Sequence, residues 1–236
     1  MFRSIVMSAC VAGFVAGLVL TLLQQPTVAP IILAAETYES STEPTNGSQA
    51  AAAHEHKDGH AHGGDTWAPA NGLERTFWSL VTNVGAAIGF ALLLCAVYTL
   101  LPKITLARGL LWGTAGFVVF FANPGLGLHP EIPGTLSADL FNRQLWWTLC
   151  VASSAAAVAL IAWRRAPWVW ACAVALLLFP HLLGAPQPEV HGSAAPQILA
   201  QQFIWATTFV NAVFWLTLGV MSAFAFRRIA AQPVAA

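Results

Sequence analysis

The sequence predicts an all-α membrane protein built as a bundle of six transmembrane helices. Of its 236 residues, 57% are hydrophobic and only 8% are charged, whereas an ordinary soluble domain is about 25% charged. The few charges are also absent from six apolar runs, each close to the roughly 20 residues that a helix needs to cross a bilayer. A water-soluble helical bundle would instead carry charged residues at helical period along its exposed faces.

The six predicted spans contain no Asp, Glu, Lys or Arg. This is expected of spanning helices, because a charge at mid-bilayer costs about 2.5–3.5 kcal/mol. The spans are residues 4–24, 77–101, 109–127, 144–163, 167–184 and 203–226, and the fifth is the shortest. They divide the chain into a first helix with its exit (1–35), an acidic and histidine-rich outer loop (36–75) and a five-helix transmembrane region (76–236).

The first span has an alternative interpretation as a cleaved signal peptide. Arg3 precedes an apolar stretch, and Ala34–Ala35 resembles a cleavage site. However, the apolar run is longer than the usual 7–15 residues of a signal core, and Leu33 occupies a position where a small residue is preferred. We therefore predict an uncleaved helix; cleavage would leave five spans.

The charged residues are sorted between the loops that six spans would connect. With the N-terminus inside the cell, seven of the ten basic residues would face the cytoplasm, as the positive-inside rule requires. All ten acidic residues and all seven histidines would then lie outside. We therefore predict an N-in, C-in topology, whose acidic outer face would concentrate cations. The inward-facing basic residues are Arg3, Lys103, Arg108, Arg164, Arg165, Arg227 and Arg228.

The long outer loop contains two His-x-His pairs with acidic residues between them. Its polar composition predicts that it is mostly disordered, and imidazole and carboxylate groups suit first-row divalent metal ions. We interpret the loop as a site of transient metal capture; the alternative is a solvated polar spacer. The candidate metal ligands are His54, His56, His60, His62 and Asp58.

A second polar group lies near the outer ends of the predicted spans. Prolines accompany it at positions 124, 130, 133, 180, 186 and 188, and membrane proteins tolerate such breaks mainly around cavities or buried protein. These side chains are candidates for one vestibule or ion pathway, although each alone also suits interfacial hydrogen bonding. They are His129, Glu131, Asp139, His181, Glu189 and His191.

Polar groups deeper in the predicted spans are sparse. Gln24, Gln25, Asn83 and Asn211 could coordinate a partly dehydrated ion, but interhelical hydrogen bonding is the preferred interpretation. Three Gly-x-x-x-Gly motifs, at residues 13–17, 85–89 and 109–113, predict close helix approach. Cys10, Cys95, Cys150 and Cys172 each lie within a span, so we predict no disulfide framework and interpret them as small apolar residues.

Several function classes are disfavoured. The zero net charge argues against a nucleic-acid-binding protein. The sequence lacks a G-x-x-x-x-G-K-[ST] loop, a His-Glu-x-x-His motif and a Gly-x-Ser-x-Gly elbow. We therefore predict that the protein is not an enzyme.

Several stretches spread over nearly the whole length carry a resemblance to a known family. They are Met1-Phe-Arg with Gly13-Phe-x-Ala-Gly17, the histidine-rich loop, His129-Pro-Glu-Ile-Pro-Gly, Asp139-Leu-x-Asn-Arg143-Gln-x-Trp-Trp147 and Pro180-His-Leu-Leu-Gly-Ala-Pro186. This resemblance is to the CbtA family of proposed bacterial cobalt transporters. It implies cobalt uptake across the bacterial inner (plasma) membrane, linked to cobalamin synthesis, together with a small single-span partner subunit that carries histidines.

The expected partners are thus the lipid bilayer, a divalent metal ion and that small subunit. The ion is the substrate, and no resident cofactor is expected. The residues alone leave nickel and zinc open beside cobalt. They also leave open a non-transporting metal sensor or accessory subunit.

Overall fold

The computed structural model describes residues 2–42, 69–164, 166–190 and 192–230. These residues form helices and no β-strand, with one isolated bridge between Thr135 and Ser193. The elements are α1 (Phe2–Thr27), α2 (Ala29–Thr42), α3 (Leu73–Thr99), α4 (Leu106–Phe117), the π-helix η1 (Val118–Ala122), α5 (Asn123–Gly125), α6 (Leu140–Trp163), α7 (Trp168–Leu183) and α8 (Gln197–Ala230).

Within the described residues, five helices are long and apolar enough to cross a membrane. They are Phe2–Thr27, Leu73–Thr99, Leu106–Gly125, Leu140–Trp163 and Gln197–Ile229. Helix α7 has 16 residues, which at 1.5 Å per residue gives about 24 Å, against a hydrocarbon core of about 30 Å. The chain is therefore a multi-pass helical membrane protein. The predicted fifth span corresponds to α7, which among the described helices is the one apolar helix shorter than the five candidate spans.

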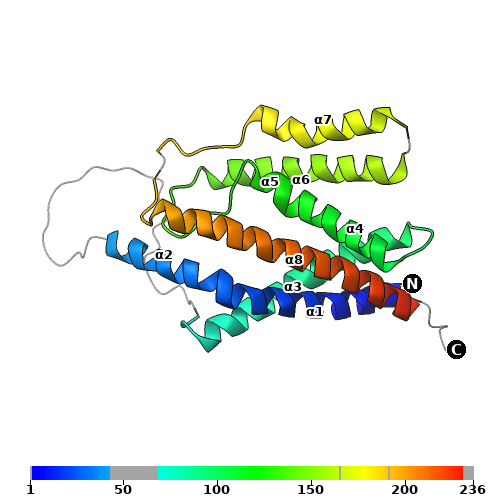
Figure 1. The fold of residues 1–236 in the computed structure, drawn as a ribbon, viewed down its shortest axis with the longest axis horizontal. Helices are drawn as coiled ribbons and strands as arrows, with labels where there is room; N and C mark the ends of the chain where they lie inside the picture. The colour runs from blue at the N-terminus through cyan, green and yellow to red at the C-terminus, as the bar shows by residue number, and fades with distance from the viewer. Residues whose placement is uncertain (1, 43–68, 165, 191, 231–236) are drawn as a thin grey trace, which may run out of the picture.

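The ends of the bundle differ in charge. The start of α1, the end of α8 and the connections after α3 and α6 lie at one end (Figure 1). Lys103, Arg108 and Arg164 are at or beside those connections. Helix α2 and the segments 126–139 and 184–196 lie at the opposite end (Figure 1), together with acidic residues such as Glu36 and Glu131. The predicted separation of charge is thus preserved between the two ends.

The expected outer loop, residues 36–75, is helical at both of its ends, where α2 finishes at Thr42 and α3 begins at Leu73. Helix α2 continues to Thr42, so residues 36–42 are helical rather than part of a disordered loop. Ala35 on α2 is buried against Ile132 and Ala195, and this small apolar cluster stabilises α2 beyond the end of α1. The proposed loop ligands His54, His56, His60, His62 and Asp58 lie outside the described residues.

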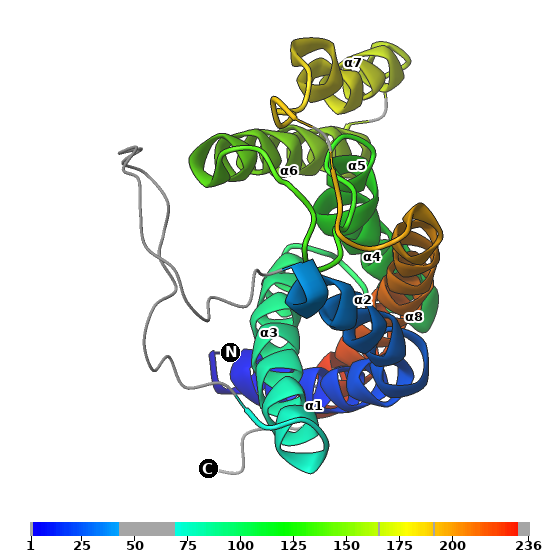
Figure 2. The ribbon, with the colours of Figure 1, turned by 90° about the vertical axis from the view of Figure 1, so that its left-hand side faces the viewer.

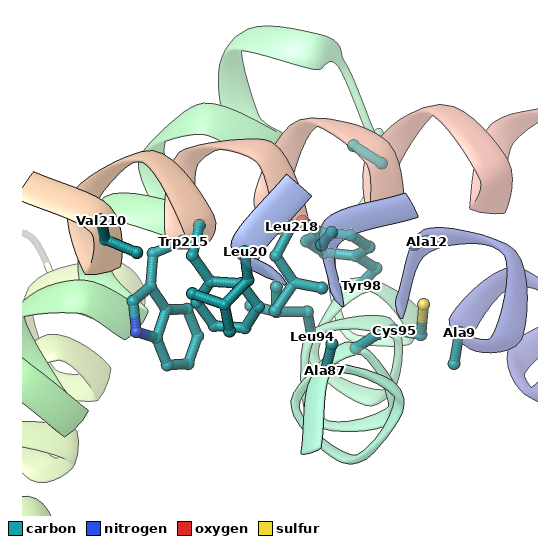
Figure 3. Packing of buried hydrophobic residues seen from close by; sticks show 14 of the residues in the cluster. Ala9, Ala12, Leu20, Ala87, Leu94, Cys95, Tyr98, Val210, Trp215 and Leu218 are labelled. Carbon is teal, nitrogen blue, oxygen red and sulfur yellow. The ribbon is translucent and has the colours of Figure 1, made fainter. Parts of the chain in front are cut away.

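Four helices, α1, α3, α4 and α8, form the core of the molecule. Figure 3 shows Leu94, Tyr98 and Leu218 among its buried residues. Two of the three glycine motifs pack as predicted. A Cβ atom added to Gly17 would lie 2.6 Å from Val84 Cα on α3, and one added to Gly219 of α8 would lie 2.7 Å from Gly113 Cα on α4.

The third glycine motif does not pack in this way. Gly85 and Gly89 have no neighbouring atom within 4 Å of an added Cβ. The open space means that this face of α3 contacts none of the described helices at the two glycines. Of the three motifs, therefore, only the two at residues 13–17 and 109–113 join helices of the core.

Two further helices, α6 and α7, form a pair on the side of the molecule away from α1 (Figure 2). Helix α7 packs against α6, and α6 packs against η1 and α5. Polar side chains occur at this seam, which makes it the natural place to look for a functional site.

Candidate functional site

A cavity of about 410 Å³ opens at the α2 end of the bundle. Segment 126–131, the start of α6 and the end of α7 with segment 185–188 enclose it. His129, Glu131 and His181 all line this space, which we call the histidine cavity. Residues 50 positions apart in the chain are thus brought together, as the vestibule hypothesis requires.

Glu131 is not a free carboxylate in the histidine cavity. Its Oε2 accepts hydrogen bonds from Arg143 Nη2 at 2.8 Å and from Ser137 Oγ at 2.6 Å. Arg143 also lines the cavity and balances the charge of Glu131. A cation that used Glu131 would therefore have to share the carboxylate with this guanidinium.

The other vestibule candidates lie elsewhere. Asp139 caps the N-terminus of α6, where its Oδ1 accepts a hydrogen bond from the Asn142 backbone N–H at 3.0 Å. This is a structural role that the sequence alone did not predict. Glu189 is exposed and is not among the residues that line the cavity. His191 lies outside the described residues.

His181 is held at the end of α7 by its neighbours. Pro180 O accepts a hydrogen bond from Trp146 Nε1 of α6 at 3.1 Å, which satisfies a carbonyl near the helix end. The Trp146 and His181 rings meet edge to face, with centroids 5.5 Å apart. Helix α7 then ends at Gly184, whose φ of 85° favours glycine.

A buried asparagine, Asn123, lies directly beneath His181. Because Pro124 has no N–H group, it cannot continue the regular backbone ladder. The preceding turn is the π-helix η1, in which the Asn123 N–H bonds to Val118 O, five residues back. Such π-helical turns occur frequently at functional sites.

The Asn123 side chain connects three segments in what we call the amide network. Its Nδ2 lies 2.8 Å from Ser154 Oγ and 3.3 Å from Cys150 Sγ, both on α6. The same nitrogen lies 3.4 Å from Leu177 O on α7. Its Oδ1 lies 3.2 Å from His181 Nε2. The cavity histidine is therefore coupled to a polar cluster inside the helix seam.

Sequence reasoning missed four residues at this site: Asn123, Trp146, Cys150 and Ser154. Cys150 is indeed buried, but it faces the Asn123 amide rather than an apolar neighbour alone. The available signals were an Asn-Pro pair at a span end and the spacing of Cys150 and Ser154, which places both on one face of a helix.

A second cavity, of about 560 Å³, lies between α1, α2 and the start of α3. Asn83 Nδ2 donates to Gln24 Oε1 at 2.7 Å and to Thr21 Oγ1 at 3.0 Å, so these groups hydrogen-bond between helices as expected. At its edge, Glu36 Oε1 pairs with Arg75 Nη2 at 2.5 Å. The hydrogen bond from Arg75 lowers the pKa of the Glu36 carboxyl.

No group of three or more His, Cys, Asp and Glu side chains in the described part of the chain is placed to hold a metal ion. The histidine cavity therefore offers two imidazoles and a shared carboxylate, not a closed metal centre.

Comparison with known proteins identifies a family for this chain. The model of one protein family, described as "probable cobalt transporter subunit (CbtA)", matches residues 2–227, nearly the whole chain. No match was found among curated proteins or among solved structures. The chain therefore belongs to the CbtA family of probable cobalt transporter subunits.

Proposed function

We propose that this protein carries a divalent transition-metal cation, cobalt in the first place, into the bacterial cell across the inner membrane, in support of cobalamin synthesis. The observation that carries the proposal is the meeting of His129 and His181 in one cavity at the acidic end of the bundle. Neutral imidazole is a good ligand for cobalt, nickel and zinc ions. Membership in a transporter-subunit family supports the same direction.

In this proposal the N- and C-termini are cytoplasmic and α7 crosses the membrane beside α6, with the bilayer thinned locally around it. A short hydrophobic helix can be accommodated by such thinning at modest cost. The histidine cavity then opens to the outside, where the ten acidic residues raise the local cation concentration. His129 would receive the ion at the exposed rim, and His181 would pass it toward the seam.

The histidine-rich stretch between α2 and α3 would collect ions before they reach the cavity. His54, His56, His60 and His62, with Asp58, form this proposed antenna. The family description as a subunit implies a partner, which we propose to be the small single-span protein with its own histidines. The chain would then supply the path and the partner would assist capture or coupling.

A second candidate function is a metal-binding accessory or sensor subunit that does not itself conduct. The family description as a subunit supports it, because a subunit can bind the ion or assist its partner without conducting the ion itself. In that case the chain would bind cobalt without increasing its entry into cells.

Uptake of radioactive cobalt by intact cells tests the proposal. The strain should lack its own cobalt importers and express the chain with its partner subunit at verified membrane levels. We expect His181→Ala to lower uptake by about tenfold or more, a typical loss when a metal site is disturbed. Replacement of the four loop histidines by Ala should lower uptake only at scarce cobalt.

The matched control is Glu189→Gln, which removes a carboxylate at the same end of the molecule but outside the histidine cavity. It should transport like the wild type. If cells with the wild-type chain take up no more cobalt than cells without it, yet the purified protein binds cobalt, the accessory function replaces the transport proposal.

A further inference from the structure

We propose that Asn123 fixes the tautomer of His181, so that Nε2 carries the proton and Nδ1 is the atom that binds the cation in the histidine cavity. Asn123 is then a positioning residue that acts through His181 and does not bind the ion itself. The tautomer follows from the hydrogen bonds alone, whereas the role of Nδ1 rests on the proposed function.

The argument begins at Ser154, whose hydroxyl has a single hydrogen to donate. Ser154 Oγ lies 2.7 Å from Cys150 O, the carbonyl one helical turn earlier, and this carbonyl can only accept. The hydroxyl proton is therefore used there. The contact of 2.8 Å between Ser154 Oγ and the Asn123 side chain must then be donated by the amide NH₂ group.

The surroundings of the Asn123 amide agree with this orientation. The nitrogen end also faces Leu177 O at 3.4 Å, a second obligate acceptor, and Cys150 Sγ at 3.3 Å. An amide oxygen in this position would meet the Leu177 carbonyl oxygen, and both atoms are acceptors. Asn123 is 8% exposed and Ser154 is fully buried, so water has little access to replace these partners.

With the nitrogen end fixed, Asn123 Oδ1 must face His181. An amide oxygen only accepts hydrogen bonds, and it lies 3.2 Å from His181 Nε2. Nε2 must therefore carry the hydrogen. In a neutral imidazole the other nitrogen, Nδ1, then has the free lone pair that a metal ion requires.

An imidazole that binds a metal through one nitrogen and donates a hydrogen bond from the other is common at protein metal sites. A ligating imidazole usually donates its second N–H to an oxygen, which fixes the tautomer and the ring orientation, and loss of that partner weakens metal affinity by about 10- to 100-fold. Here the oxygen is that of the Asn123 amide, and the edge-to-face contact between the Trp146 and His181 rings is a second constraint. His181 would thus enter the cavity with its donor atom already selected.

The experiment is nitrogen NMR of the full-length protein in lipid bilayers, with isotope-labelled histidine side chains and no metal. The His181 signals are identified by their loss in His181→Gln. We expect the Nε2–H tautomer in the wild type. We also expect it in Ser153→Ala, a matched control that removes a neighbouring hydroxyl without touching Asn123. A wild-type spectrum dominated by the Nδ1–H tautomer would overturn the proposal.

Variants at Asn123 separate positioning from simple structural damage. Asn123→Leu removes the acceptor and should produce a mixture of tautomers, whereas Asn123→Asp keeps an oxygen beside Nε2 and should restore the Nε2–H form. If Asn123→Leu does not fold, the wild type and Asn123→Asp still test the assignment. Spectra in which neither protein shows the Nε2–H form would contradict it.

Zinc ion, which is diamagnetic, then serves as the metal probe. Zinc titration should shift the Nδ1 resonance of His181, with affinity lowered about tenfold or more in Asn123→Leu. A shift at Nε2 instead would overturn Nδ1 as the binding atom. An Nδ1 shift in a protein that gives no cobalt uptake in cells would support this inference while contradicting the transport function.

Discussion

The core and the α6–α7 pair are held together by different chemistry. In the core, glycines of α1, α4 and α8 bring helix backbones into direct contact, and Gly17 packs on Val84 of α3. At the seam between η1, α6 and α7, side-chain hydrogen bonds from Asn123 and Trp146 cross between segments. A glycine contact between backbones has little room to move, whereas a hydrogen bond can exchange partners.

This difference indicates which part of the molecule can move. Interhelical hydrogen bonds in membranes contribute only about 0.6–2 kcal/mol each. Helix α6 also has a smaller interface with η1 and α5 than α4 has with α8, so we expect displacement of the α6–α7 pair to cost less than separation of α4 from α8. The cavity histidine lies at the weaker seam, so we expect changes of the core to affect folding and changes of the seam to affect ion handling.

The largest effect is expected from Gly219→Leu in the core. An added Cβ would lie 2.7 Å from Gly113 Cα and 2.8 Å from Gly113 N, and would also meet Gly109 O. These are backbone atoms that cannot turn aside, so we expect a loss of about 3 kcal/mol or more. Thermal unfolding of the purified protein in detergent should show a clear fall in midpoint, or no folded protein at all.

The control for this variant is Gly85→Leu on α3. An added Cβ there meets no atom within 4 Å in the described structure, so stability should be close to that of the wild type. Equal destabilisation by the two variants would contradict the distinction between the packed and the open glycine faces.

A smaller effect is expected from Trp146→Phe at the seam. The change removes the indole N–H that satisfies Pro180 O, and an orphaned buried acceptor costs about 1–3 kcal/mol. The ring contact with His181 would also loosen, so cobalt uptake should fall more than the unfolding midpoint does. Trp147→Phe, at the adjacent position, which is 40% exposed and outside the contacts of Pro180 and His181, should leave both measurements nearly unchanged.

The helices could be predicted because uncharged apolar runs report directly on the membrane. The same signal does not show the end of α2, whose residues 36–42 are polar and follow Ala35, which packs against Ile132 and Ala195. Nor could the amide network be predicted. It depends on the π-helix η1 just before Asn123 and on which faces of α6 and α7 meet, and the second of these is set by packing between distant segments.

The vestibule candidates also show what the sequence could not predict. His129 and His181 shared only a predicted side of the membrane, and their place in one cavity follows from the ends of α5 and α7. Asp139 shared that side too, yet it caps α6. A common side of the membrane is thus a weaker constraint than a common cavity.

The smallest effect concerns the ion pair at the edge of the second cavity. Arg75 lowers the pKa of Glu36 below its ordinary value of about 4.3. A lowered folded-state pKa means that this stabilisation is present above pH 4.3 and is lost as the pH falls through the folded pKa. Because both side chains are about one third exposed, the contribution should be no more than about 1 kcal/mol.

Glu36→Gln should therefore lower the unfolding midpoint slightly at pH 7 and not in acid below the folded-state pKa of Glu36, where the wild type has lost the same interaction. The control is Glu39→Gln, one turn away on α2, where no ion pair is found in the described structure. If Glu36→Gln destabilised the protein equally at both pH values, the amide would be disturbing the packing of α2 rather than removing a charge. Glu36 would then stabilise α2 by packing, as the apolar contacts of α2 do. The α6–α7 seam, whose segments are joined by side-chain hydrogen bonds, would remain easier to displace than the core.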